Sequence, residues 1–328
     1  MEVDIVKALT ELAPKLGGTS VENAQRLSGG ASMHTWAFTV VGPTGRQEMI
    51  LRRRNVPFDE AASRSTSLAT EAALILGAAA VGAPVAPLIR LCEPEDGVGE
   101  AHITLRIPGE ALGRKIVNDA RFEAVRPKLA RQCGRVAAQI HTMTGEGIPL
   151  KRANAQEELE RYKEVYRASG AERPILELAL QHLKKNPPPP MDEVLLHGDF
   201  RNGNIMFDPD IGVAAVLDWE LSHWGDPAED LSWICVNSWR FGRADKPVGG
   251  FGQYSDLLDG YAEAGGVDVP LSRVLYWQAL GSLKWGIMCL MMYSSYATGA
   301  ESSVERPMIG RRVSETEIDL INLLEAGL

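Results

Sequence analysis

The first third of the chain combines several strand-like patterns with one helix-like pattern. Short runs rich in Val, Ile, Thr and Phe are separated by glycine-containing turns, and one Pro-Thr-Gly turn predicts a β-hairpin. Residues 67–80 are dense in Ala and Leu and are followed by Gly82 and Pro84, which predicts a helix ending there. The predicted strands cover residues 25–27, 35–41, 48–53, 85–92 and 101–107.

Helical periodicity dominates the rest of the chain. It covers much of residues 118–185, stops at the proline run of residues 187–190 and resumes beyond Asp226. The segment between these helical blocks contains short apolar runs typical of strands. These runs cover residues 194–196, 205–207 and 213–217.

Length and composition indicate a folded protein with two lobes. The 328 residues exceed what one hydrophobic core usually accommodates, and Pro108-Gly109 ends the strand-rich part. We therefore expect an α+β protein with a small antiparallel-sheet lobe, residues 1–108, and a larger, mainly helical lobe, residues 109–328. The hydrophobic fraction of 45% and the charged fraction of 23% are those of a packed protein.

Charge and hydropathy make two classes of partner improbable. The net charge is -9 and no basic stripe is present, so a nucleic acid partner is not expected. The most apolar segment, residues 275–296, is interrupted by Gln278 and Lys284, which predicts a buried helix and no membrane partner. Glu2 and Asp4 replace the basic start of a signal peptide, and the cysteines lack CxxC spacing, so a cytoplasmic location with reduced thiols is expected.

One segment concentrates polar residues between the short apolar runs. It reads His-Gly-Asp-Phe-Arg-Asn-Gly-Asn, ends at Asn204 and is followed by Asp218 after a short hairpin. We expect Phe207 to lie opposite Val213 in that hairpin. This register places Asn204 opposite Val216, with Asp218 as its diagonal neighbour on the same sheet face. Because carboxylate and amide oxygens suit Mg²⁺, Asn204 and Asp218 are predicted to share one magnesium ion.

Asp199 lies in the loop that precedes these two candidate ligands. An acid five residues before an asparagine, with a second acid after a hairpin, is the spacing of a phosphoryl-transfer centre. Asp199 could accept the proton of an attacking hydroxyl while the metal offsets charge on the transferred group. The alternative is that Asp199 and Asn202 organise a turn through Asx hydrogen bonds. The order and spacing of Asp199, Asn204 and Asp218 together favour Asp199 as the catalytic base.

The segment from His197 to Asn204, followed by Asp218-Trp219-Glu220, resembles the catalytic core of the aminoglycoside phosphotransferase and choline kinase-like families, relatives of the protein kinases. This resemblance implies a protein kinase-like two-lobe fold and ATP as the phosphate donor. It also implies Asp199 as catalytic base, with Asn204 and Asp218 as magnesium ligands. The resemblance extends to Gly225, Asp226, Pro227 and Asp230-Leu231, which are similar to the start of the family's following helix. N-capping of that helix is a compatible role for Asp226.

The same resemblance implies a nucleotide clamp in the first lobe. Arg52 stands where the family usually has a phosphate-binding lysine, and Glu71 matches the partner of that cation. Strand alternation places Arg52 and Arg53 on opposite faces of the strand, and Arg53 is the alternative candidate for the lysine position. Arginine holds phosphate with a geometry different from that of an ammonium group. Small residues let backbone N–H groups approach a nucleotide. The phosphate loop is accordingly expected at Ser28, Gly29, Gly30, Ala31 and Ser32.

These features predict an enzyme that moves the γ-phosphate of ATP, with Mg²⁺, to a hydroxyl of a small molecule. The Leu-Arg-Arg run at Arg52 resembles the subfamily associated with acyl-CoA dehydrogenases, which favours a hydroxyacyl acceptor, with coenzyme A-linked metabolites among the candidates. The alternatives are a kinase-like nucleotide-binding module without catalysis and a true aminoglycoside kinase. A polycationic aminoglycoside favours a dense acidic rim, yet the C-terminal acids also fit the solvated side of a docking helix. These acids are Glu315, Glu317, Asp319 and Glu325.

Overall fold

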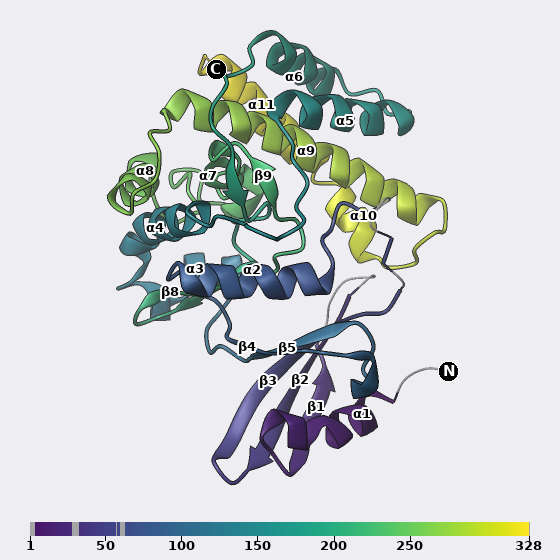
Figure 1. The fold of residues 1–328 in the computed structure, drawn as a ribbon. Helices are drawn as coiled ribbons and strands as arrows, with labels where there is room; N and C mark the ends of the chain where they lie inside the picture. The colour runs from purple at the N-terminus through teal and green to yellow at the C-terminus, as the bar shows by residue number, and fades with distance from the viewer. Residues whose placement is uncertain (1–3, 28–32, 57, 60–62, 328) are drawn as a thin grey trace.

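The chain folds into a small sheet-containing lobe and a larger, mainly helical lobe (Figure 1). The computed structural model describes residues 4–27, 33–56, 58–59 and 63–327. The first helix, α1 (Ile5–Leu12), begins at Asp4, whose side chain accepts a hydrogen bond from the Lys7 backbone N–H. Its apolar side packs against the sheet in a separate small core. The predicted α+β arrangement is confirmed.

The small lobe contains one five-stranded antiparallel sheet in the order β1-β2-β3-β5-β4. Alternation along β3 turns Leu51 into the small core and Arg52 toward the larger lobe. The strand expected over residues 85–92 is shorter, because Val85 instead forms a bridge with Val216 of the larger lobe. The strands are β1 (Ser20–Arg26), β2 (Met33–Gly42), β3 (Gly45–Arg54), β4 (Leu88–Leu91) and β5 (Ala101–Leu105).

The predicted helix after the hairpin, α2 (Leu68–Ala80), connects the two lobes. It begins at Ser67, whose hydroxyl accepts a hydrogen bond from the Thr70 backbone N–H at 3.1 Å. Its apolar residues, among them Leu74, pack into the core of the larger lobe. Glu71, one turn from its start, is buried and faces Arg52 of β3. The helix therefore fixes an acidic group beside the sheet.

The larger lobe consists of helices around two short β-ribbons, with α9 crossing its centre (Figure 1). The ribbons are β6 (Val194–Leu196) with β9 (His223–Gly225), and β7 (Ile205–Asp208) with β8 (Gly212–Val216). The helices are α3 (Gly113–Asn118), α4 (Leu129–His141), α5 (Ala155–Ala168), α6 (Pro174–Lys185), α7 (Ala228–Trp233), α8 (Tyr254–Glu263), α9 (Leu271–Ala297), α10 (Glu305–Gly310) and α11 (Val313–Glu325).

Contrary to expectation, the acidic residues of the C-terminal helix α11 do not all lie on its solvated side. Asp319 is buried rather than solvent-facing, and its carboxylate accepts a hydrogen bond from the Ser282 hydroxyl of α9. The reason is that α11 packs along α9, which buries Thr316, Leu320 and Leu323 on the same side as Asp319. Asp319 is therefore unsuited to an acidic rim for a polycationic substrate.

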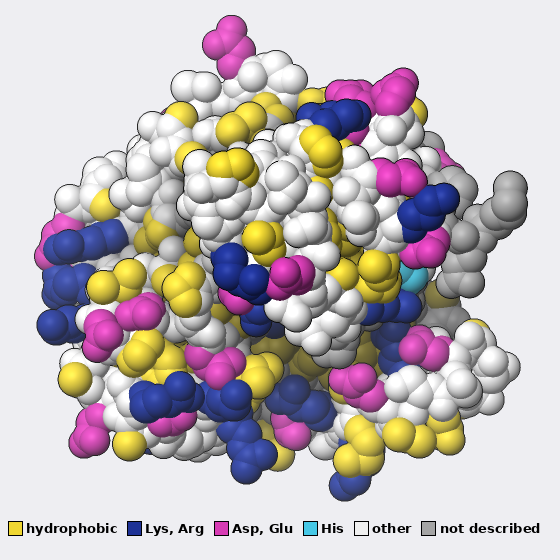
Figure 2. Space-filling view, turned by 90° about the horizontal axis from the view of Figure 1, so that it is seen from below, with side chains coloured by type: hydrophobic (Ala, Val, Ile, Leu, Met, Phe, Trp, Pro, Cys, Tyr) yellow, Lys and Arg dark blue, Asp and Glu magenta, His cyan; other side chains and the backbone are white. Residues whose placement is uncertain are grey.

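Surface charges are mixed at the sheet end of the molecule. Figure 2 shows Lys and Arg side chains interspersed with Asp and Glu on this face, with hydrophobic side chains between them. Among the described side chains of this face, neither sign of charge forms a continuous block. Within the described ranges, no helix is long and apolar enough to cross a membrane.

Candidate active site

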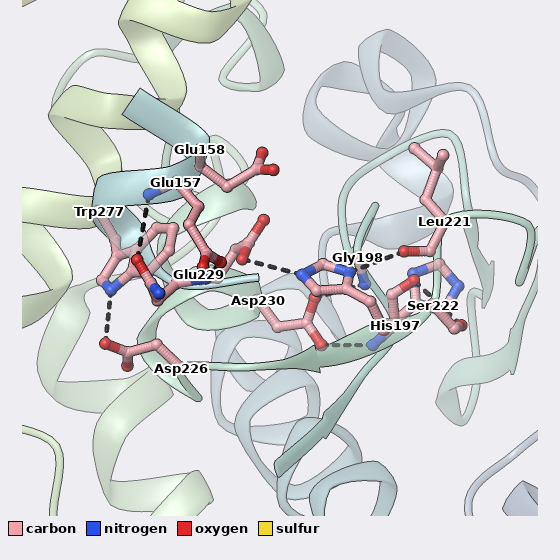
Figure 3. Close-up of polar contacts among 12 residues, drawn as sticks. Glu157, Glu158, His197, Gly198, Leu221, Ser222, Asp226, Glu229, Asp230 and Trp277 are labelled. Atoms are coloured by element: carbon pink, nitrogen blue, oxygen red, sulfur yellow. Dashed lines mark hydrogen bonds and ion pairs between the residues drawn. The ribbon is translucent and has the colours of Figure 1, made fainter. Parts of the chain in front are cut away.

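The loop after β6 is held in place by a buried carboxylate on α7. Asp230 accepts hydrogen bonds from the backbone N–H groups of His197 at 2.7 Å and Gly198 at 2.9 Å (Figure 3). His141 contacts the same carboxylate at 3.2 Å through Nε2. Burial acts to raise the pKa of Asp230, but the hydrogen bond from His141 and the neighbouring charges hold the pKa below its usual value. Asp230 thus fixes the backbone immediately before Asp199.

The Asp199 carboxylate receives hydrogen bonds from three side chains. Arg201 donates through Nε to Oδ1 at 2.9 Å and through its terminal nitrogen to Oδ2 at 3.2 Å. The indole Nε1 of Trp233 donates to Oδ1 at 2.5 Å, and Nδ2 of Asn204 donates to Oδ2 at 2.6 Å. Arg201 also stacks 4.4 Å above the centre of the Trp239 ring. These contacts orient a partly exposed carboxylate rather than forming a simple Asx turn.

The hairpin that carries the candidate metal ligands differs in register from the prediction. Phe207 lies opposite Val213, as expected, but a β-bulge then shifts the pairing so that Ile205 lies opposite Val216. Asn204 consequently faces Leu217, whose backbone N–H donates to the Asn204 carbonyl at 2.7 Å. The next residue, Asp218, has the left-handed φ of 65°. The predicted pairing of Asn204 with Val216 was therefore wrong, because the bulge inserts one residue.

Arg52 contacts three carboxylates, two of which, those of Asp218 and Glu220, belong to the larger lobe. Its Nε lies 3.2 Å from Glu71 Oε2, while one terminal nitrogen donates to Asp218 at 2.6 Å and to Glu220 at 2.8 Å. Burial acts to lower the pKa of Arg52, and the charge of Glu71, with the other two acids, raises it above the ordinary value. Arg52 thus brings together the predicted residues Glu71 and Asp218.

The neighbouring arginines point elsewhere. Arg53 donates through Nε to the Val98 carbonyl at 3.0 Å, on the other side of β3. Arg54 donates to the Thr66 carbonyl at 3.0 Å. Of the predicted nucleotide-binding residues, Ser28, Gly29, Gly30, Ala31 and Ser32 lie outside the described residues.

The charge balance around Arg52 suits an additional cation. Three carboxylates, those of Glu71, Asp218 and Glu220, surround one guanidinium, which leaves two negative charges in excess when all are ionised. Burial raises the pKa of Asp218, against the opposing charge of Arg52. Burial, followed by the charge of Asp218, raises the pKa of Glu220 to about 7. A divalent cation would offset this excess.

The donor atoms also suit magnesium. Asn204 donates its amide N–H groups to the Asp199 carbonyl at 3.0 Å and to the carboxylate, which leaves the amide oxygen to act as a ligand. Asp218 supplies a carboxylate. The described residues contain no group of three His, Cys, Asp or Glu side chains that could hold a metal ion. A site with two protein ligands is compatible with Mg²⁺, which keeps waters and takes further oxygens from substrate phosphates.

Three residues in this site were not predicted to be functional: Glu220, Asp230 and Trp233. Glu220 carries a signal in the sequence, since it closes the Asp218-Trp219-Glu220 motif that resembles the family's metal-binding segment. The family resemblance includes Asp230, but no role followed from it, whereas Trp233 reaches the loop before Asn204 only because α7 packs behind it. The contacts of Asp230 and Trp233 bridge more than thirty positions along the chain, so no local pattern indicates what these side chains touch.

The sequence between residues 23 and 267 matches the model of the phosphotransferase enzyme family. It is 27% identical over 242 residues to acyl-CoA dehydrogenase family member 11 of Pongo abelii, and the match covers 68% of this chain. That match spans only 31% of the relative, about a third of its length. The expected similarity to proteins associated with acyl-CoA dehydrogenases is confirmed.

Solved structures with the same fold cover nearly the whole chain. A putative aminoglycoside phosphotransferase from Ralstonia eutropha has a TM-score of 0.74 at 22% identity, with 99% of each chain covered. Spectinomycin phosphotransferase, solved with ADP and spectinomycin, has a TM-score of 0.64 at 14% identity, with 98% of each chain covered. The prediction of a kinase-like two-lobe fold is confirmed. The chain belongs to the phosphotransferase enzyme family.

Proposed function

We propose that this protein transfers the γ-phosphate of ATP to a hydroxyl group of a small molecule. The observation that carries the proposal is the convergence of Asp199, Asn204 and Asp218 on one loop and hairpin, facing Arg52 of the other lobe. Within one site, these groups supply a base, two oxygen ligands for a cation and a guanidinium for phosphate. Family membership supports the same reaction class.

Asp199 is the base in this proposal. As the acceptor oxygen bonds to the γ-phosphorus, the bond from that phosphorus to the bridging oxygen breaks and ADP leaves. Asp199 takes the hydroxyl proton, and its hydrogen bonds from Arg201 and Trp233 hold the carboxylate in one orientation during the transfer. Bound Mg²⁺ supplies positive charge that offsets the charge of the phosphates, with Asn204 and Asp218 as its protein ligands.

The nucleotide is assigned to the small lobe, residues 1–108, and the acceptor to residues 109–328. Arg52, positioned by Glu71, would contact phosphate. The expected phosphate loop, Ser28, Gly29, Gly30, Ala31 and Ser32, would offer backbone N–H groups to the nucleotide. The ADP bound in the spectinomycin phosphotransferase structure supports a nucleotide in this fold. Arginine can engage two phosphate oxygens at once, which an ammonium group cannot do with the same planar geometry.

The acceptor is proposed to be a hydroxylated acyl or other carboxylate-derived metabolite, with coenzyme A-linked esters as the first candidates. The similarity to acyl-CoA dehydrogenase family member 11 supports this direction. The burial of Asp319 removes one of the few C-terminal acids that could attract a polycationic aminoglycoside.

A phosphate-transfer screen tests the proposal. The protein, ATP and MgCl₂ are incubated with hydroxyacyl-CoA esters, homoserine, choline, sugars and aminoglycosides, and acceptors are read by a mass increase of one phosphoryl group. Transfer to a hydroxyacyl ester is the expected result. Efficient transfer to kanamycin-type compounds alone would overturn the acceptor assignment and retain the kinase. Nucleotide binding without phosphate transfer to any compound of the screen would favour the alternative, a kinase-like nucleotide-binding module without catalysis.

A further inference from the structure

A cavity of about 690 Å³ lies beside the candidate active site, and none of the proposed catalytic or metal-binding residues is among its lining residues. Its walls come from residues 63–70, residues 149–161 and the segment Leu221–His223. Figure 3 shows Glu157 and Glu158 of α5 on one side, with Leu221 and Ser222 on the other. Two hydrogen bonds join the walls to the catalytic segment: Thr66 N–H donates to the Glu220 carbonyl at 2.7 Å, and the Ser222 hydroxyl donates to the His197 carbonyl at 3.3 Å.

The lining of this cavity is basic, although the chain as a whole carries a net charge of -9. Four Lys or Arg side chains stand against two carboxylates among the described lining residues, and one of the four, Arg152, is paired with Glu193 outside the cavity. His223 adds no net charge, because it is paired at 3.2 Å with Glu229, whose charge outweighs burial and raises the pKa of His223 to about 9. The basic residues are Arg64, Lys151, Arg152 and Arg161.

The acidic residues in the lining are already engaged. Glu158 is buried and accepts hydrogen bonds from Arg64 at 3.1 and 3.2 Å, and from Arg161 through Nε at 3.2 Å. Burial acts to raise the pKa of Glu158, but the charge of Arg64 and its other cationic neighbours lowers it below the usual range. Glu157 accepts a hydrogen bond from the Asn154 backbone N–H at 3.1 Å and caps α5. Two arginines therefore share one carboxylate, which leaves positive charge at the wall.

The basic groups are also accessible. The side chains of Arg64 and Arg161 keep 43% and 32% of their surface exposed, although each is anchored to Glu158. Lys151 lies on another wall of the cavity, and its side chain is oriented by a hydrogen bond of 2.7 Å that Nζ donates to the Ser63 carbonyl. Anchored guanidinium groups lose little conformational freedom when an anion binds, and their planar edges match phosphate oxygens. Like charge disfavours a polycation in the same space.

We propose that this cavity binds a phosphate group carried by an organic ligand, with Arg64, Lys151 and Arg161 as the binding residues. A cavity of about 690 Å³ is large for a single phosphate ion and falls in the range of small-molecule sites, so the phosphate belongs to a larger metabolite. The ligand is either a phosphate-bearing acceptor, in which case the inference rests on the proposed function, or a separate phosphorylated metabolite.

Pyrophosphate binding, measured by calorimetry on the full chain without ATP or magnesium, tests this inference. Pyrophosphate serves as a probe because it carries the phosphate chemistry without an adenine. We expect Lys151→Met, and separately Arg64→Gln, to weaken pyrophosphate binding about tenfold or more, consistent with the loss of a charged hydrogen bond. The matched control is Arg167→Gln, on α5 but paired with Glu177 outside the cavity. Thermal unfolding of each variant checks that the fold is retained.

The location of binding separates the outcomes. If Arg52→Ala weakens pyrophosphate binding while Lys151→Met and Arg64→Gln do not, the anion occupies the proposed nucleotide site and the inference is overturned. Absence of binding at millimolar pyrophosphate also overturns it, whether or not phosphate transfer is found. If binding follows the cavity variants, competition with the identified acceptor assigns the phosphate to the acceptor. Binding without competition assigns it to a separate ligand.

Discussion

The indole Nε1 of Trp233 donates a hydrogen bond of 2.5 Å to Oδ1 of Asp199. Trp233 lies at the end of α7, the same helix whose Asp230 holds the backbone of His197 and Gly198. One short helix therefore positions both the backbone and the side chain of the catalytic loop. The orientation of the proposed base depends on a buried packing contact rather than on the loop alone.

Trp233→Phe is expected to lower kcat about tenfold while leaving Mg-ATP affinity near that of the wild type. The substitution keeps an aromatic ring but removes one hydrogen bond to a carboxylate, which is typically worth about 1.5–3 kcal/mol. Steady-state kinetics with the acceptor found by the screen measures the effect. Trp285→Phe is the matched control, because the buried Trp285 indole N–H has no hydrogen-bond partner among the described residues. An equal loss in both variants would argue against a specific role for Trp233.

Arg52→Ala is expected to raise the KM for ATP about tenfold or more, and Arg53→Ala to change it little. Arg52 faces Glu71 and Asp218, whereas Arg53 faces the Val98 carbonyl on the other side of the strand. Loss of a guanidinium that contacts phosphate removes a charged hydrogen bond. Parallel ATP titrations of the two variants provide the measurement. The opposite ranking would place the phosphate contact on Arg53.

Asp218→Ala is expected to abolish productive Mg-ATP binding. The substitution removes the only carboxylate proposed as a metal ligand, so the phosphates remain poorly neutralised. Calorimetry with Mg-ATP gives the readout, and Asp210→Ala, at the exposed turn of the same hairpin, is the control. Wild-type affinity in Asp218→Ala would remove Asp218 from the metal site.

The stability of the protein is expected to fall as the pH rises from about 6.5 to about 9. His223 has its pKa raised to about 9, chiefly by Glu229 acting against burial, while the nearby Lys284 opposes the shift. Because the folded pKa exceeds the unfolded value, the contribution is complete below pH 6.5 and is lost as pH approaches 9, by roughly 3 kcal/mol at most. Denaturant unfolding of the wild type and His223→Gln measures it. A difference between the two proteins that stays constant across this pH range would contradict the assignment.

Much of the fold and part of the candidate site could be predicted from the sequence. Asp199, Asn204 and Asp218 lie in one short segment, and strand alternation correctly separates Arg52 from Arg53. The bulge in the β7–β8 hairpin could not be predicted, because its residues fit either register. The contacts that Asp230 and Trp233 make with the loop could not be predicted, because they arise only when α7 packs behind it.

Asp199→Asn tests most directly whether Asp199 is the base of a phosphate transfer. The substitution keeps the size of the side chain and removes its ability to take a proton at neutral pH. We expect Mg-ATP affinity and thermal stability to stay close to those of the wild type while turnover of the acceptor falls by roughly 100-fold or more. The measurement is kcat at saturating ATP and acceptor, together with calorimetric Mg-ATP binding. Full turnover in Asp199→Asn would exclude Asp199 as the base.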